Sequence, residues 1–215
     1  MIHFHIVTLF PESIEPYLKS SILGRAIVAK RIKISFYDPK KFTRDKYGRV
    51  DRRPYGGGPG MVLEPDGMLR AAEKAVGKKR GAEKIFFATD GDIFDEAMAK
   101  RLSKKKDVLL ICGHYEGVDA RVQKILKARK VSMGPFVITG GELPAATVID
   151  AVARFVSGVL GKSESLEASR VSSPEVYTRP ETLVWKGKKH KVPKVLLTGH
   201  HAKIEEWKKS KRNVA

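Results

Sequence analysis

The chain is 215 residues long, enough for one ordinary domain with a small appendage and too short for a large multidomain protein. Hydrophobic residues make up 42% of it and charged residues 31%, which is typical of a folded protein and excludes a wholly disordered chain. Forty-two Lys and Arg against 24 Asp and Glu give a formal net charge of +18. The natural partner is therefore a polyanion, with nucleic acid ahead of an anionic membrane surface.

The single cysteine and the N-terminus indicate the cellular compartment. Cys112 cannot form a disulfide within the chain and follows an apolar run, which is typical of a buried thiol in a reducing environment. The N-terminus lacks the basic start and long apolar stretch of a signal peptide, and no segment approaches the ~20 apolar residues of a membrane span. We expect a cytoplasmic protein with no membrane partner.

Short apolar runs alternate with stretches of helical period, which predicts an α/β fold with a parallel sheet covered by helices on both faces. The expected strands are Ile2–Thr8, Ile32–Phe36, Ile85–Thr89, Val108–Cys112 and Val131–Ile138. The expected helices are Ser13–Lys30, Asp66–Val76, Asp95–Ser103, Ala120–Lys127 and Pro144–Val159.

The pattern changes after residue 161. Residues 1–161 are expected to form the main domain, residues 162–180 a flexible linker rich in Ser, Glu and Pro, and residues 181–215 a small, basic domain that ends in a short amphipathic stretch.

Positive charge gathers in two windows of the chain. Residues 28–53 hold ten basic and three acidic residues, and residues 185–215 hold ten basic and two acidic residues. This concentration favours contacts with RNA phosphates, the alternative being two solvated basic surfaces with no partner.

Three glycine-rich segments are candidates for holding a small molecule. Residues 52–61 contain four Gly and two Pro but lack the Gly-Lys-Ser/Thr ending of a P-loop. Residues 112–117 and 139–144 follow two expected strands, at the edge where open α/β sheets bind ligands. Neither has Gly-x-Gly-x-x-Gly spacing, so a cofactor without phosphate, such as S-adenosylmethionine (AdoMet), is compatible, and each could also be an ordinary turn.

The order and spacing of residues 53–61 (RPYGGGPGM), 112–119 (CGHYEGVD), 138–144 (ITGGELP) and 149–155 (IDAVARF) closely resemble the bacterial tRNA (guanine-N1)-methyltransferase family. Further matches lie at residues 8–11, 177–180 and 192–201, so the resemblance covers almost the whole chain. It implies methyl transfer from AdoMet to N1 of guanosine 37, beside the tRNA anticodon. It also implies a homodimer with a deep C-terminal trefoil knot of the SPOUT type, plus a small helical C-terminal domain that binds the anticodon arm.

The resemblance also implies which residues form the site. Those expected to contact AdoMet are Phe87, Ala88, Gly113, Tyr115, Glu116, Gly117, Met133, Gly134, Phe136, Val137, Ile138, Gly140, Gly141 and Pro144. Arg154 would stabilise the negative charge that develops on guanine as N1 loses its proton. The structural alternative for Arg154 is an ion pair with Asp150, four residues earlier on the same helix.

The general base is where this chain departs from the family, whose linker supplies an aspartate for that role. Counting from Arg154 without a gap, Ser169 occupies this place, and a serine cannot accept the proton as an aspartate would. Glu167 is the leading replacement, with Glu164 and Glu116 as further candidates. The departure also allows a catalytically impaired or retargeted homologue that binds AdoMet and RNA.

Histidines do not predict a metal centre in this sequence. The spacing of His190, His200 and His201 matches no zinc pattern, and no cysteines accompany them. His3 and His5 alternate on one face of a strand and are expected to be structural. Mg²⁺ assists the reaction in the family, but the sequence points to no dedicated site for it.

Overall fold

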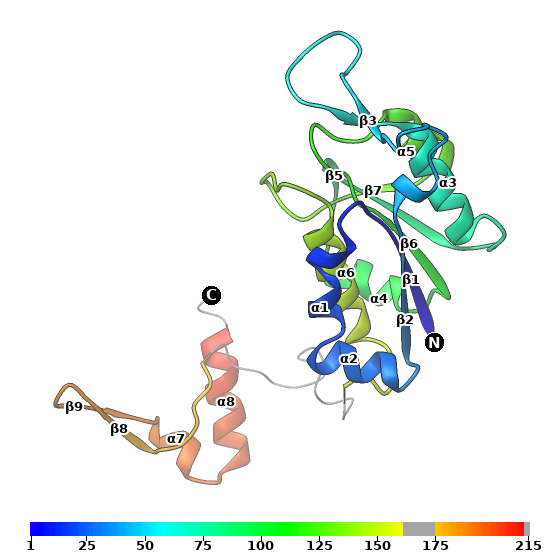
Figure 1. The fold of residues 1–215 in the computed structure, drawn as a ribbon. Coiled ribbons are helices and arrows are strands. Elements are labelled where there is room, and N and C mark those ends of the chain that lie inside the picture. Colours follow the sequence, from blue (N-terminus) through cyan, green and yellow to red (C-terminus); the bar gives the residue numbers. More distant parts are fainter. Residues whose placement is uncertain (161–174, 213–215) are drawn as a thin grey trace. The chain divides into compact units, whose positions relative to one another are not determined.

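The computed structural model describes residues 1–160 and 175–212. The chain divides into two compact units, Met1–Gly161 and Lys162–Ala215. The larger unit is built on a five-stranded sheet in the order β2-β1-β6-β5-β7, with every neighbouring pair parallel (Figure 1). Its strands are β1 (Ile2–Val7), β2 (Ile32–Tyr37), β5 (Glu83–Ile93), β6 (Asp107–Ile111) and β7 (Arg129–Ser132). The α/β class expected from the sequence is confirmed.

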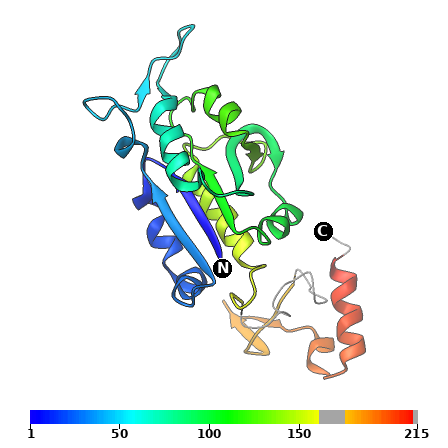
Figure 2. The same cartoon turned by 90° about the vertical axis from the view of Figure 1, so that its right-hand side faces the viewer.

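Helices cover both faces of this sheet, as the views in Figure 1 and Figure 2 show. One face is covered by α1 (Glu15–Leu18), α2 (Ser21–Val28), α4 (Glu96–Leu102) and α6 (Glu142–Ala153). The other face is covered by α3 (Pro65–Val76) and α5 (Ala120–Leu126). Short elements complete the unit: the 3₁₀ turns η1 (Pro11–Ser13) and η2 (Pro39–Lys41), and the strand pair β3 (Asp51–Arg52) and β4 (Val62–Leu63).

The central strand β6 shows why the apolar run at residues 108–111 forms a strand buried on both sides. Val108 and Leu110 face one hydrophobic core, and Leu109 and Ile111 face the other. All four are at most 1% exposed. Side chains of a strand alternate between faces, so a continuous apolar run satisfies a sheet that has helices on both sides.

Three expected elements of the main unit were wrong in extent or continuity. The helix expected at Pro144–Val159 ends at Ala153, and the chain continues in turns whose N–H groups bond the carbonyl three residues earlier. The single helix expected at Ser13–Lys30 is broken into α1 and α2, because Ser21 adopts a positive φ of 47° that a continuous helix does not allow. The strand expected at Val131–Ile138 ends at Ser132, since Gly134 has a φ of 147°, a conformation that belongs to glycine. Residues 133–141 are consequently a loop.

The smaller unit contains a β-hairpin that the sequence reading missed. Its described elements are β8 (Thr182–Trp185), β9 (Lys188–Lys191), α7 (Lys194–Leu197) and α8 (His201–Arg212). The hairpin is closed by Lys186 and Gly187, both with positive φ, which is the backbone of a tight two-residue turn. The helices expected in this unit are present as α7 and α8, and the hairpin is an addition to them. No helix in the described parts of the chain has the length and apolar character needed to cross a membrane.

Candidate functional site

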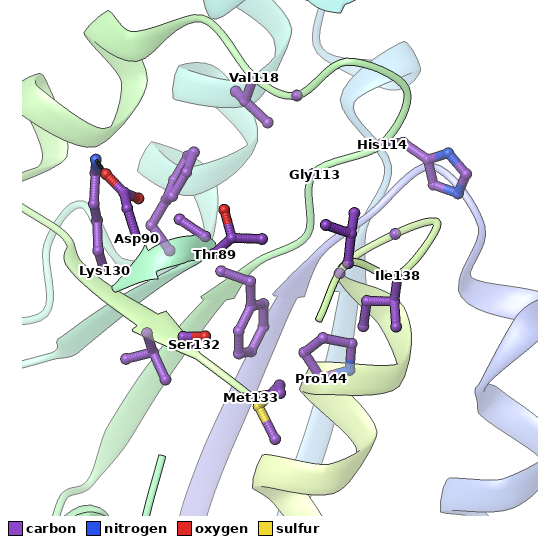
Figure 3. Close-up of a pocket in the computed structure, with 18 of the residues that line it drawn as sticks. Thr89, Asp90, Gly113, His114, Val118, Lys130, Ser132, Met133, Ile138 and Pro144 are labelled. Carbon is purple, nitrogen blue, oxygen red and sulfur yellow. Dashed lines mark hydrogen bonds and ion pairs between the residues drawn. The ribbon is translucent and has the colours of Figure 1, made fainter. Parts of the chain in front are cut away.

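A cavity of about 530 Å³ opens at the carboxyl-terminal side of the main sheet (Figure 3). This volume falls within the range of ~300–1,000 Å³ typical of small-molecule sites. Its walls come from β5 and from the segments that follow β6 and β7. The position agrees with the edge at which parallel sheets bind ligands, because the loops that leave this edge are free to diverge around a molecule.

The loop after β6 is held on one side by the segment that leads into α6. The Gly141 N–H donates to the Gly113 carbonyl at 2.9 Å, and the backbones of His114 and Gly140 form an isolated antiparallel β-bridge. A Cβ atom on Gly141 would lie 2.5 Å from the Cα of Cys112. Only glycine lets these two stretches of backbone come so close, which explains a glycine pair at this point of the sequence.

On its other side, the same loop is held by the glycine-rich segment that precedes β4. The Glu116 N–H donates to the Met61 carbonyl at 3.0 Å, and the Leu63 N–H donates to the Gly117 carbonyl at 2.9 Å. A Cβ atom on Gly60 would lie 2.5 Å from Oε1 of Glu116, so the Glu116 side chain rests against this glycine. The three glycine-rich segments noted in the sequence are thus neighbours in space.

Thirteen of the fourteen residues expected to contact AdoMet line the cavity; the exception is Gly134. Gly134 shapes the loop after β7, since a Cβ atom there would lie 2.6 Å from the ring of Phe136. The segments that bring these residues together are far apart in the sequence but adjacent at the sheet edge.

Sequence reasoning missed several polar residues of the cavity, which are Thr89, Asp90, Gln123, Lys124, Lys130 and Ser132. His114 and Thr139 also line it and lie within the candidate glycine-rich segments. Asp90 accepts a hydrogen bond from Lys130 at 2.6 Å, and this bond lowers the pKa of the Asp90 carboxyl. Figure 3 shows the two side chains pointing toward each other, with Met133, Ile138 and Pro144 on the other side of the cavity. Asp90 interrupts the apolar run of β5, and this interruption is the feature of the sequence that could have identified it as a cavity residue.

A buried carboxylate lies behind the cavity wall. Glu142, the first residue of α6, is 6% exposed, and its Oε1 accepts a hydrogen bond from the Thr8 hydroxyl at 2.6 Å. The Thr8 hydroxyl in turn accepts the Phe10 N–H at 3.0 Å, and Nε2 of His114 lies 3.8 Å from Oε2 of Glu142. These contacts tie the end of β1 to the loop after β6 and to the start of α6.

Cys112, at the end of β6, is buried as expected from the sequence. Burial, followed by the nearby Glu142 charge, raises the pKa of its thiol well above the usual value. The thiol is therefore protonated at neutral pH, which identifies it as a packing residue rather than a nucleophile.

Of the residues expected to act in catalysis, only Arg154 lies in the described part of the chain. Arg154 occupies the C-cap position, directly after the last residue of α6, and is not among the residues that line the cavity. It follows Pro144 by ten residues, or about 15 Å along the helix at ~1.5 Å per residue. Glu167, Ser169 and Glu164 lie outside the described residues.

Comparison with known proteins decides the family. Residues 2–214 match the family described as tRNA (Guanine-1)-methyltransferase TrmD. The chain belongs to this family. A tRNA (guanine-N(1)-)-methyltransferase of Caldanaerobacter subterraneus subsp. tengcongensis is 44% identical over 214 residues, which cover 97% of this chain and 86% of the relative. Relatives of the same name from Clostridioides difficile and Dictyoglomus turgidum are 37% and 41% identical and cover 96% and 97% of this chain, and 90% and 84% of their own lengths.

Membership in this family implies AdoMet as the methyl donor, and the cavity residues fit that molecule. AdoMet has a flat adenine ring and carries positive charge on its sulfonium and ammonium groups. The cavity offers apolar surfaces from Phe87, Met133 and Pro144 and carboxylates from Glu116 and Asp90. Apolar walls with a few placed polar groups are what a site for such a ligand requires.

The Thr8–Glu142 hydrogen bond is expected to stabilise the wall of the cavity. Thr8→Val keeps the shape of the side chain but removes the hydroxyl, leaving the buried carboxylate without its short hydrogen bond. We expect the free energy of unfolding in urea to fall by about 1–3 kcal/mol and AdoMet to bind more weakly. Thr147→Val is the matched control: Thr147 lies on α6, is exposed, and bonds only its own helix. Its effect should stay within about 0.5 kcal/mol, and equal losses in the two variants would contradict the assignment.

Proposed function

We propose that the cavity binds AdoMet and that this protein methylates N1 of guanosine 37 of tRNA. As a member of its family the protein is an AdoMet-dependent tRNA (guanine-N1)-methyltransferase. The observation that supports the finer assignment is the convergence of two motif segments, residues 113–118 and 138–144, around one cavity. The third segment, residues 60–63, is hydrogen-bonded to the first of them.

The chemistry explains which groups the reaction needs. N1 lies on the Watson–Crick edge of guanine, so the base must leave its stack before it can react. N1 also carries a proton at neutral pH, and a positioned carboxylate is the usual group to remove it. Bound AdoMet supplies the electrophilic methyl group.

We assign these roles to residues of this chain as follows. Glu167 accepts the N1 proton, because Ser169 stands at the family's aspartate position and cannot. Arg154 stabilises the negative charge that develops on O6 and the ring as the proton leaves. Glu116 lines the cavity and is placed to hold the positively charged end of AdoMet.

The separation of Arg154 from the cavity supports a homodimer in which one copy completes the site of the other. Within one chain, the length of α6 keeps Arg154 away from Pro144 at the cavity. Apolar side chains are exposed at the rim of the cavity, among them Val137 at 82% and Leu143 at 63%. Exposed apolar surface beside a site is typical of a subunit contact. We also propose that the segment from β6 to α6 forms a SPOUT-type trefoil knot.

The tRNA is the proposed partner of the two basic windows. Lys188, Lys189 and Lys191 are exposed along β9, and Lys40 and Arg44 are exposed in the first window. Contacts of this kind supply affinity for the phosphates of the anticodon arm without reading sequence. The proposal places the protein in the cytoplasm with its substrate.

Mg²⁺ is proposed as an assisting ion that arrives with the substrates. In the described parts of the chain, the cavity has no group of three His, Cys, Asp or Glu side chains arranged to hold a metal. The ion would therefore depend on AdoMet or RNA oxygens for most of its ligands.

The first test is methyl transfer from radiolabelled AdoMet to an unmodified tRNA transcript with guanosine at position 37. A transcript that differs only by adenosine at that position is the control. We expect label in the first transcript alone, recovered as N1-methylguanosine after digestion. Label in both transcripts would show that the protein methylates a nucleotide other than the one at position 37. Label in neither, with AdoMet binding intact, would leave a homologue that binds without catalysis.

The second test concerns the general base. Glu167→Gln removes the proton acceptor but keeps the size of the side chain, so we expect kcat to fall by about 10²–10⁴-fold with AdoMet affinity unchanged. Glu164→Gln and Ser169→Ala are the controls and should retain turnover close to that of the unaltered protein. Unchanged turnover in Glu167→Gln would remove Glu167 from the role, and a loss in Glu164→Gln would transfer the role to that residue.

The third test concerns the shared site. Arg154→Ala and Ala88→Trp, which fills the cavity, should each be inactive alone. A heterodimer of the two variants, purified through two different affinity tags, combines one intact cavity with one intact Arg154. If subunits share the site, it should recover about half of the normal activity, because one of its two sites is complete. An inactive heterodimer would show that both elements must come from the same chain.

A further inference from the structure

A second cluster of polar side chains lies at the other edge of the sheet, where β1 and β6 begin. His3 and His5 alternate along β1 and so face the same side of the sheet. Strand register places His3 beside Asp107, the first residue of β6. The two imidazole rings are close, with centroids 3.7 Å apart. In Figure 1 the start of β1 is marked by the label N.

The donor atoms of the cluster are spaced for a small cation. Nδ1 of His3, Nε2 of His5 and Oδ1 of Asp107 all lie within 4.8 Å of one another. The Asp107 oxygen is 2.9 Å from Nε2 of His5 and 3.9 Å from Nδ1 of His3. Ligand atoms around a tetrahedral zinc ion with bonds of about 2.0–2.1 Å are about 3.3 Å apart. Shifts of about 1 Å would therefore bring the three donors to metal-ligand positions.

The remaining ring nitrogens are held by hydroxyl groups on β2. Nε2 of His3 lies 2.9 Å from the Ser35 hydroxyl, and Nδ1 of His5 lies 3.1 Å from the Tyr37 hydroxyl. Such second contacts fix the orientation of ligating histidines in metal sites. Burial lowers the pKa of His3 to about 4 and also lowers the pKa of His5, with Lys33 and Lys79 acting in the same direction and Asp107 against it.

Lys79 shows that the cluster already stabilises a positive charge. Its ammonium group lies 2.6 Å from Oδ1 of Asp107 and 3.2 Å from Nε2 of His5. The Lys79 side chain is 36% exposed and reaches the cluster from the segment after α3, so it can swing into solvent. A metal ion would have to displace it, which makes Lys79 an intramolecular competitor.

We propose that His3, His5 and Asp107 form a site for a divalent transition-metal cation, with Zn²⁺ as the probe. Two imidazoles and one carboxylate, with a fourth position for water, are a ligand set that zinc accepts. The site is at the far edge of the sheet from the methyl-transfer cavity. Its effect would therefore be to link β1 to β6 and stabilise the folded state, because an ion that binds only the folded chain raises stability.

The test is titration of the full chain with Zn²⁺ alone, followed by calorimetry and by competition with a chromogenic chelator. We expect the unaltered chain to bind one Zn²⁺ ion. Compared with it, the affinity for Zn²⁺ should be at least tenfold weaker in His3→Gln, whose side chain can still bond Ser35. In Lys79→Met the affinity should be at least tenfold tighter. A combined His190→Gln, His200→Gln and His201→Gln variant is the control and should bind as the unaltered chain does. Co²⁺ substitution should give the visible absorption of a four-coordinate ion.

Four outcomes would overturn the proposal. They are equal affinity in the unaltered chain and in His3→Gln, loss of binding in the triple histidine control, binding that is found only in Lys79→Met, and no binding in any variant. Circular dichroism of each variant shows whether it is folded, so that lost binding is not confused with lost structure.

Discussion

A methyl group on Gly141 would overlap the main chain of Cys112, so this glycine sets how closely the start of α6 approaches the end of β6. The loop after β6 is then held between that glycine and residues 60–63, with main-chain hydrogen bonds on both sides. Because backbone atoms make these contacts, little side-chain entropy is lost when the walls form. Main-chain contacts of this kind preorganise the walls of the cavity, which lowers the entropy cost of binding a ligand.

The buried carboxylate of Glu142 fixes the remaining wall. It stands at the N-terminal end of α6, where the helix dipole favours a negative charge, and Thr8 supplies a hydrogen bond from the end of β1. A buried charge that lost these partners would be costly, so α6 has little freedom to move relative to the sheet. Pro144 lies in the first turn of the same helix and lines the cavity. The electrostatics of one side chain therefore limit the shape of the binding site.

The sequence predicted what depends on local pattern and missed what depends on tertiary contacts. Apolar runs placed four strands of the main sheet closely and the fifth, β7, only at its last two residues. Two of the three glycine-rich segments, at residues 112–117 and 139–144, supply cavity walls. The break at Ser21, the loop from Gly134 and the hairpin turn at Lys186 rest on single backbone conformations that hydrophobic periodicity does not register. The Thr8–Glu142 pair joins residues 134 positions apart, and no spacing rule predicts such a contact.

The distribution of residues along the chain separates cofactor binding from chemistry. Every residue that lines the cavity lies between positions 86 and 144, whereas the residues proposed to act on the guanine, Arg154 and Glu167, follow them in the sequence. In the proposed arrangement, the cavity walls hold the cofactor, and other parts of the homodimer complete the catalytic groups. Changes outside the cavity should then act on turnover rather than on cofactor affinity, because they alter contacts made only in the transition state. In the proposal, Ser169 at the family's aspartate position is a change of this kind, expected to affect turnover and not AdoMet affinity.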